Sequence, residues 1–213
     1  MRTISAHATV SEVTKQVFTK RELAACDTLP EKKRKVHLAG VLALHRALIK
    51  LYPNVSHVEV LRQHDAPPTV LVDGKATPSL QVSVSHSKGV SCAVVARGRG
   101  AIGVDIQSSE GFTLSPEQFY SPEELEREKT RSPVLIWAYK EALLKALRVG
   151  LHIHPKRLRL TLNEAGNLLG AHVDETPLFA TGRQLGLVSS SIAVLVMLNN
   201  DAEEALFKTR RKS

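Results

Sequence analysis

The sequence feature that most limits how this chain can fold is a short pattern that occurs twice. Residues 18–23 begin with Phe and end in Glu-Leu, and they lead to a helical stretch that finishes at residues 45–50. Residues 119–125 also begin with Phe and end in Glu-Leu, and they lead to residues 140–145. Both stretches finish with basic-x-Ala-Leu-apolar-Lys. A true repeat predicts two similar subdomains related by a pseudo-twofold axis, and chance similarity between two amphipathic helices is the alternative.

Two stretches have the pattern of long helices. Residues 31–50 place apolar side chains on one helical face. Ser132-Pro133 should open the second long helix, because Ser is a common N-cap and Pro is favoured in the first turn, and Gly150 should end it. Shorter helices are expected at residues 20–26 and after Ser121, where Glu124 completes a capping box.

Short apolar or alternating stretches between turn residues predict strands. They cover residues 58–61, 69–72, 82–85, 91–96, 101–106 and 158–162, with a last apolar region at 185–198. These strands and helices are distributed over both halves of the chain, as the repeat would require. We expect an N-terminal subdomain at residues 1–100, a C-terminal subdomain at 101–200 and a basic tail at 201–213.

The composition narrows the class of protein. The chain has 213 residues, 43% of them hydrophobic, so it can bury one good core or two small ones. No stretch approaches the roughly 20 apolar residues that span a bilayer, and residues 1–7 lack the apolar core of a secretory signal. Cys26 and Cys92 stand apart without a metal-binding pattern, which favours reduced thiols. We therefore expect a cytoplasmic protein that does not associate with membranes.

The charge balance favours an acidic partner. The net charge is +8 and the isoelectric point about 9.7, which suits nucleic acid, an anionic surface, an acidic protein or a polyphosphate ligand. Only 4% of the residues are aromatic, so little surface is available to stack on bases. This weakens the case for single-stranded nucleic acid, and charge alone does not choose among the other partners.

Two carboxylates and a lysine form the strongest candidate for chemistry. Asp105 follows the apolar stretch 101–104, while Trp137, Glu141 and Lys145 are spaced to share one helical stripe. Two carboxylates beside a lysine suit a divalent cation bound to a phosphate ester. The alternatives are that Asp105 caps a loop and that Glu141 and Lys145 form an ordinary surface pair.

Other residues of this region refine the metal site. Gln107 lies on the same strand face as Asp105 and could ligate a metal through its oxygen, or hold a coordinated water, without adding charge. In the first copy of the repeat Arg46 stands where the second copy has Glu141. Only the second half can therefore supply the carboxylate, and one active cleft between the subdomains is expected.

The N-terminal half holds candidates for phosphate binding. Ser85-His86-Ser87 closes an apolar strand before Lys88-Gly89, and such small polar residues let a phosphate approach the backbone. The basic run 32–35 opens a helix, where an anion would offset unfavourable charge. Lys75 follows the tight turn Asp73-Gly74. The alternatives are a hydrogen-bonded histidine at a strand end and solvated lysines.

These motifs, in this order, resemble the surfactin-synthetase type of 4′-phosphopantetheinyl transferase, and the resemblance covers about residues 18 to 196. The family pattern has Gly-Lys-Pro, Ser-His-Ser, Gly-(Ile/Val)-Asp-(Ile/Val)-Glu and Trp-x-x-Lys-Glu-x-x-x-Lys. The matching stretches here are 74–76, 85–87, 103–107 and 137–145. The last two are specific when they occur together, and the first two support them.

The resemblance implies a fold, an activity and a set of roles. It implies an α+β fold of two similar subdomains related by a pseudo-twofold axis, each with a small antiparallel sheet packed against a long helix. It also implies an enzyme that transfers phosphopantetheine from coenzyme A to a serine of an acyl or peptidyl carrier protein, releasing 3′,5′-ADP. Asp105, Gln107 and Glu141 would bind Mg²⁺, Glu141 would be the candidate base, and Lys145 would contact the pyrophosphate. The nucleotide end of coenzyme A would be held by Lys32, Lys35, Lys75, Ser85 and His86. A monomer is expected, because one chain holds both half-sites.

Two departures from the family pattern keep other functions open. Ala76 replaces the usual Pro, and Gln107 replaces the Glu that often completes the metal site. Weaker metal binding is expected, with water in the vacant position. One alternative is therefore a catalytically weak protein of this fold that binds coenzyme A or a carrier. Another is a basic nucleic-acid-binding protein, which would leave the arrangement of Asp105, Glu141 and Lys145 unexplained.

Overall fold

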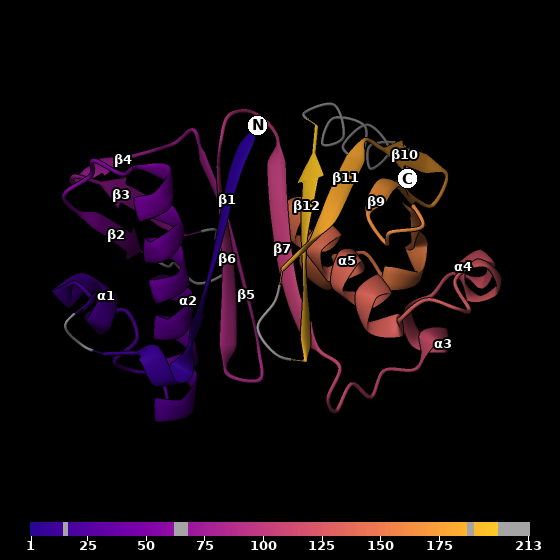
Figure 1. The fold of residues 1–213 in the computed structure, drawn as a ribbon, viewed down its shortest axis with the longest axis horizontal. Helices are drawn as coiled ribbons and strands as arrows, with labels where there is room; N and C mark the ends of the chain where they lie inside the picture. Colours follow the sequence, from indigo (N-terminus) through magenta and orange to yellow (C-terminus); the bar gives the residue numbers. More distant parts are fainter. Residues whose placement is uncertain (15–16, 62–67, 187–189, 200–213) are drawn as a thin grey trace. The chain divides into compact units, whose positions relative to one another are not determined.

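The computed structural model describes residues 1–14, 17–61, 68–186 and 190–199, and it divides the chain into two units (Figure 1). Unit 1 comprises Met1–Gly98 and unit 2 comprises Arg99–Ser213. Each unit has its own hydrophobic core. The basic tail expected at residues 201–213 lies outside the described residues.

Unit 1 packs the long helix α2 (Glu31–Leu51) against antiparallel strands. One sheet has the order β1-β6-β5, formed by β1 (Arg2–Thr9), β6 (Val90–Arg97) and β5 (Leu80–Ser87). The other has the order β2-β3-β4, formed by β2 (Val58–Leu61), β3 (Thr69–Val72) and β4 (Lys75–Ala76). The short helices η1 (Val10–Glu12) and α1 (Lys20–Ala24) precede α2. Apolar residues of α2, β1, β2 and β6 form the core.

Unit 2 packs the helix α5 (Pro133–Ala146) against a larger antiparallel sheet. The strand order is β10-β9-β11-β12-β7, and β8 pairs with β9. The strands are β7 (Ala101–Ser108), β8 (Leu158–Leu162), β9 (Leu168–Val173), β10 (Thr176–Leu178), β11 (Ala180–Leu185) and β12 (Ser191–Leu198). The short helices are α3 (Pro116–Phe119), α4 (Pro122–Arg127), η3 (Gly150–His152) and η4 (Pro155–Arg157).

The two units share one order of elements. In the described part of each unit, a first strand is followed by two short helices, a long helix and five further strands, and unit 2 adds the short helices η3 and η4 after α5. The pairing β1-β6-β5 corresponds to β7-β12-β11, and β2-β3-β4 corresponds to β8-β9-β10. The predicted fold class, a mixed α+β fold with antiparallel sheets and a long helix in each similar half, is confirmed.

Two simpler expectations can be compared with the structure. Cys26 and Cys92 are both buried as free thiols. None of the helices in the described part of the chain has the length and apolar character that crossing a bilayer would require.

Candidate functional site

The backbones of β7 and α5 touch at Gly103. A Cβ atom on this residue would lie 1.8 Å from the carbonyl oxygen of Ala142 and 2.7 Å from the amide nitrogen of Ala146. Only a residue without a side chain permits this approach. Asp105, two residues further along the same strand, is therefore held close to the helix that carries Glu141 and Lys145.

Helix α5 is buried on most of its surface. From Val134 to Ala146 every side chain is buried except those of Trp137, Glu141 and Lys145, which are partly exposed. These are the positions that the spacing of four residues places on one stripe. Between Val134 and Ala146, the stripe of Trp137, Glu141 and Lys145 is thus the partly exposed face of α5.

Asp105 accepts hydrogen bonds on both carboxylate oxygens. Lys145 Nζ lies 2.7 Å from Asp105 Oδ1 and also donates to the carbonyl oxygen of Val104, at 3.2 Å. Gln107 Nε2 donates to Asp105 Oδ2 at 2.9 Å. Asp105 is only 2% exposed, so the donors that a buried carboxylate needs come from these neighbouring side chains.

Glu141 lies in the field of the same groups. Burial and the negative charge of Asp105 raise its pKa, while the Lys145 ammonium opposes the rise. Two carboxylates and one ammonium leave an excess negative charge that a bound cation would offset. The donor set suits Mg²⁺, because Mg²⁺ binds one or two carboxylates and retains several waters.

The donor set offers few protein ligands for a metal. Among the described residues no group of three or more His, Cys, Asp and Glu side chains is placed to hold one. The candidate metal ligands are therefore the carboxylates of Asp105 and Glu141 and the amide oxygen of Gln107. Gln107 already donates its amide nitrogen to Asp105, which leaves that oxygen as its metal-binding atom.

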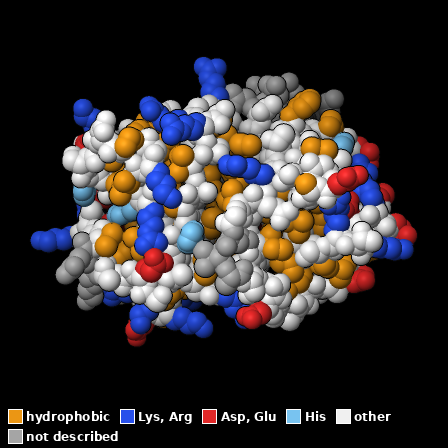
Figure 2. Space-filling view, in the orientation of Figure 1, with side chains coloured by type: hydrophobic (Ala, Val, Ile, Leu, Met, Phe, Trp, Pro, Cys, Tyr) orange, Lys and Arg blue, Asp and Glu red, His pale blue; other side chains and the backbone are white. Residues whose placement is uncertain are grey.

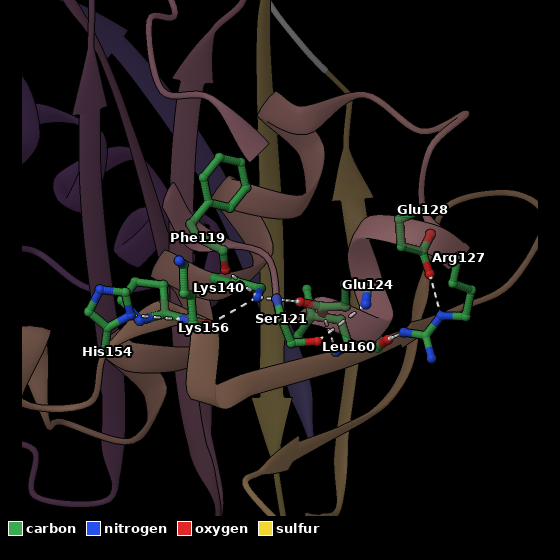
Figure 3. A network of polar contacts seen from close by, with 10 residues as sticks. Phe119, Ser121, Glu124, Arg127, Glu128, Lys140, His154, Lys156 and Leu160 are labelled. Carbon is green, nitrogen blue, oxygen red and sulfur yellow. Dashed lines mark hydrogen bonds and ion pairs between the residues drawn. The ribbon is translucent and has the colours of Figure 1, made fainter. Parts of the chain in front are cut away.

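Lys140 points away from these carboxylates. Its ammonium is fully buried and donates to Glu124 Oε2 at 2.5 Å, to the carbonyl oxygen of Phe119 at 2.7 Å and to that of Pro155 at 3.0 Å (Figure 3). The stretch from Trp137 to Lys145 therefore has two separate polar faces. One face reaches β7 and the other anchors the helix to its neighbours.

A pocket in unit 1 brings together two of the predicted phosphate-binding residues. It has a volume of about 530 Å³ and is lined by Leu29, Lys32, Lys33, Val36, His37 and His86. The lining residues come from the start of α2, the residues just before it and the end of β5. Lys32 and His86 thus share a pocket open to a ligand.

The other predicted residues of unit 1 do not line this pocket. Lys35 pairs with Glu31 at 2.8 Å on the surface of α2. Lys75 is exposed on β4. Ser85 is buried, whereas the adjacent His86 is exposed, and successive residues of a strand point to opposite faces.

Most of the net positive charge belongs to unit 1. Residues 1–98 contain 14 Lys and Arg against 7 Asp and Glu, whereas residues 99–213 contain 15 against 14. Figure 2 shows Lys, Arg and His side chains over α2, while Asp and Glu side chains gather over α4. An anionic ligand is therefore attracted chiefly by unit 1.

A comparison with protein families bears on unit 2. The family described as the 4′-phosphopantetheinyl transferase superfamily matches residues 101–193. The match supports membership of this superfamily. It begins at the first residue of β7 and includes all of α5, so it contains Asp105, Gln107, Glu141 and Lys145. No curated protein gives a significant match to the chain.

Two features were not predicted from the sequence: His37 in the unit 1 pocket and the buried contact of Glu124 in unit 2. His37 was not singled out, although Lys33 and His37 are four residues apart on one helix and so share a face. Glu124 was predicted only as part of a capping box. Its carboxylate is in fact fully buried and accepts from Lys140, a contact between separate helices that local spacing does not indicate.

Proposed function

We propose that this protein is a Mg²⁺-dependent 4′-phosphopantetheinyl transferase of the surfactin-synthetase type. It moves phosphopantetheine from coenzyme A to a serine of an acyl or peptidyl carrier protein and releases 3′,5′-ADP. The observation that carries the proposal is the contact of Lys145 with Asp105, beside the raised-pKa carboxylate of Glu141, within the segment that matches the superfamily.

Unit 2 supplies the reactive groups in this proposal. Asp105, Glu141 and the amide oxygen of Gln107 hold Mg²⁺, which neutralises charge on the phosphoryl group when bound. Lys145 contacts the pyrophosphate as a point charge. Glu141 accepts the proton of the carrier serine as the general base.

Unit 1 binds the nucleotide end of coenzyme A in this proposal. Lys32 and His86 contact phosphate from within their shared pocket. Lys35, Lys75 and Ser85 lie outside that pocket, and their contacts with coenzyme A stay a prediction. The excess of basic residues in this unit also attracts an acidic carrier protein and speeds encounter. We propose that the enzyme acts as a cytoplasmic monomer.

The direct test is transfer to a carrier protein. The purified protein is incubated with coenzyme A, Mg²⁺ and several apo carrier proteins, and the carriers are weighed by mass spectrometry. We expect a mass gain of one phosphopantetheine, abolished in Asp105→Asn and Glu141→Gln. Glu164→Gln, which changes an exposed glutamate in the β8–β9 turn, is the matched control. Absence of a mass gain on every carrier would reject the proposal.

Gln107 supports a second candidate, a protein that binds coenzyme A or a carrier without efficient transfer. Its amide adds no negative charge to the metal site and is already bonded to Asp105. Calorimetric titration with coenzyme A separates the two functions. Binding that is unchanged in Glu141→Ala, together with no mass gain on any carrier, would favour the binding protein.

A further inference from the structure

A buried glutamate in unit 2 joins several elements of the fold. Glu124 accepts from the backbone nitrogen of Ser121 at 3.0 Å, and Ser121 Oγ accepts from the backbone nitrogen of Glu124 at 3.2 Å. The other carboxylate oxygen of Glu124 accepts a hydrogen bond from the backbone nitrogen of Leu160 in β8 at 2.8 Å. The ammonium of Lys140 then binds the same carboxylate (Figure 3). The capping glutamate of α4 thus connects α5 with β8.

Unit 1 contains a network of the same construction. Glu22 accepts from the backbone nitrogen of Thr19 at 2.9 Å, and Thr19 Oγ1 accepts in return at 3.1 Å. The other carboxylate oxygen of Glu22 accepts a hydrogen bond from the backbone nitrogen of Val60 in β2. The same oxygen hydrogen-bonds to His45 of α2, and both distances are 2.7 Å. His45 and Lys140 occupy the same place in the repeated pattern. The network is therefore part of the repeated fold.

The contacts of Lys140 are directional and complete. Its three ammonium protons match its three acceptors, Glu124 and the carbonyl oxygens of Phe119 and Pro155. These acceptors lie on α4, at the end of α3 and at the start of η4. Replacing a buried ion pair with apolar residues is often neutral for stability. A purely stabilising role would thus not require this arrangement.

The anchored residue directly precedes Glu141 on α5. Adjacent residues of an α-helix differ by about 100° in direction, so fixing Lys140 also fixes which way Glu141 points. We propose that Lys140, held by Glu124, is a positioning residue that sets the rotation of α5 and thereby aims Glu141 and Lys145 at Asp105. The proposal rests on the proposed transferase function for its kinetic consequence.

The test removes the ion pair without leaving a buried charge. Lys140→Met alone would strand the Glu124 carboxylate, so the variant is Lys140→Met with Glu124→Gln. The matched control, His45→Met with Glu22→Gln, removes the corresponding network in unit 1. We expect kcat to fall about 10- to 100-fold in the unit 2 variant, as for a displacement of about 1 Å, with the KM for coenzyme A unchanged within about twofold. The control should keep its kcat within about twofold of the wild-type value.

Wild-type kcat in the unit 2 variant would overturn the positioning role. An equal loss of kcat in the unit 1 control would also overturn it, because loss of any buried network would then suffice.

A second readout does not depend on catalysis. Mg²⁺ should raise the Tm of the wild type by binding Asp105 and Glu141, and Glu141→Gln should abolish this gain. The unit 2 double variant should lose most of the gain, and full retention would overturn the positioning role. If Mg²⁺ raises the Tm of the wild type but no phosphopantetheine is transferred, the proposed transferase function is rejected. The positioning role is then decided by comparing the Mg²⁺-dependent rise in Tm of the wild type with that of the unit 2 double variant. A wild type with neither transfer nor gain would overturn both.

Discussion

Adding one methyl group at Gly103 should separate α5 from β7. The new Cβ would lie 1.8 Å from the carbonyl oxygen of Ala142, whereas ordinary contact begins near 3.4 Å, so the two backbones must move apart by 1.6 Å. The obstructing atoms belong to the helix backbone, so no side chain can rotate to make room. The helix itself must therefore shift.

The shift should damage both stability and the site. Overpacking of this kind costs about 1–3 kcal/mol, which lowers Tm by at least about 4 °C in a unit of this size. Lys145 Nζ now lies 2.7 Å from Asp105 Oδ1, and moving it outward by the same 1.6 Å breaks that hydrogen bond. A displacement above 1 Å should lower kcat by about 10²-fold.

Gly103→Ala is compared with Gly170→Ala in β9, where a Cβ would meet nothing within 4 Å. Thermal unfolding and carrier modification are measured for both variants. We expect the control to match the wild type in both measurements. If Gly103→Ala also keeps its Tm and kcat, the close packing of α5 on β7 does not position the carboxylates, and the reasoning fails.

Two further predictions follow from the site. Burial and the charge of Asp105 raise the pKa of Glu141 above its ordinary value of 4.5. At a pH above this raised pKa the ionised carboxylate therefore lowers the free energy of unfolding, and this loss disappears as the pH falls below 4.5. Glu141→Gln should therefore raise Tm at neutral pH and lose this advantage in acid, whereas an advantage independent of pH would contradict the assignment. Lys32→Ala and His86→Ala should each raise the KM for coenzyme A by about tenfold, with Lys50→Ala at the other end of α2 as the control. Unchanged KM values would remove the unit 1 pocket from the nucleotide site.

Much of the fold could be predicted because local patterns there agree with tertiary packing. The strands at residues 58–61, 69–72 and 158–162 have the predicted bounds. The helix at residues 31–50 extends by one residue to Leu51. The capping box of Ser121 and Glu124 is also present. In each case apolar periodicity or a capping residue fixes the element locally.

Strands without such a pattern were missed. β1 has only Ala6 and Ala8 as buried residues, and neither has a strand-favouring side chain. β9 contains Gly170, and two of the three buried residues of β11 are the small Ala180 and Gly182. Pairing partners distant in the sequence define these strands. The same limit applies to Lys140, because its carboxylate partner lies on another helix.

Equivalent positions of the two units differ at the two carboxylates, Asp105 and Glu141, that unit 2 carries. β1 and β7 are eight-residue strands, each paired antiparallel along its whole length with its neighbour, and the fifth residue is Ala6 in β1 and Asp105 in β7. On the long helices, Arg46 takes the place of Glu141 and pairs with Glu12 at 2.7 Å.

Unit 1 therefore lacks both of the carboxylates proposed to bind the metal, while keeping the buried glutamate network that holds its long helix. The network maintains the shared architecture, and the residues at the two substituted positions differentiate the units. If this division is correct, losing the network should affect whichever function its own helix carries. Loss of the Glu124–Lys140 pair should then appear in kcat, and damage to the start of α2, where phosphate binding is proposed, should appear in the KM for coenzyme A.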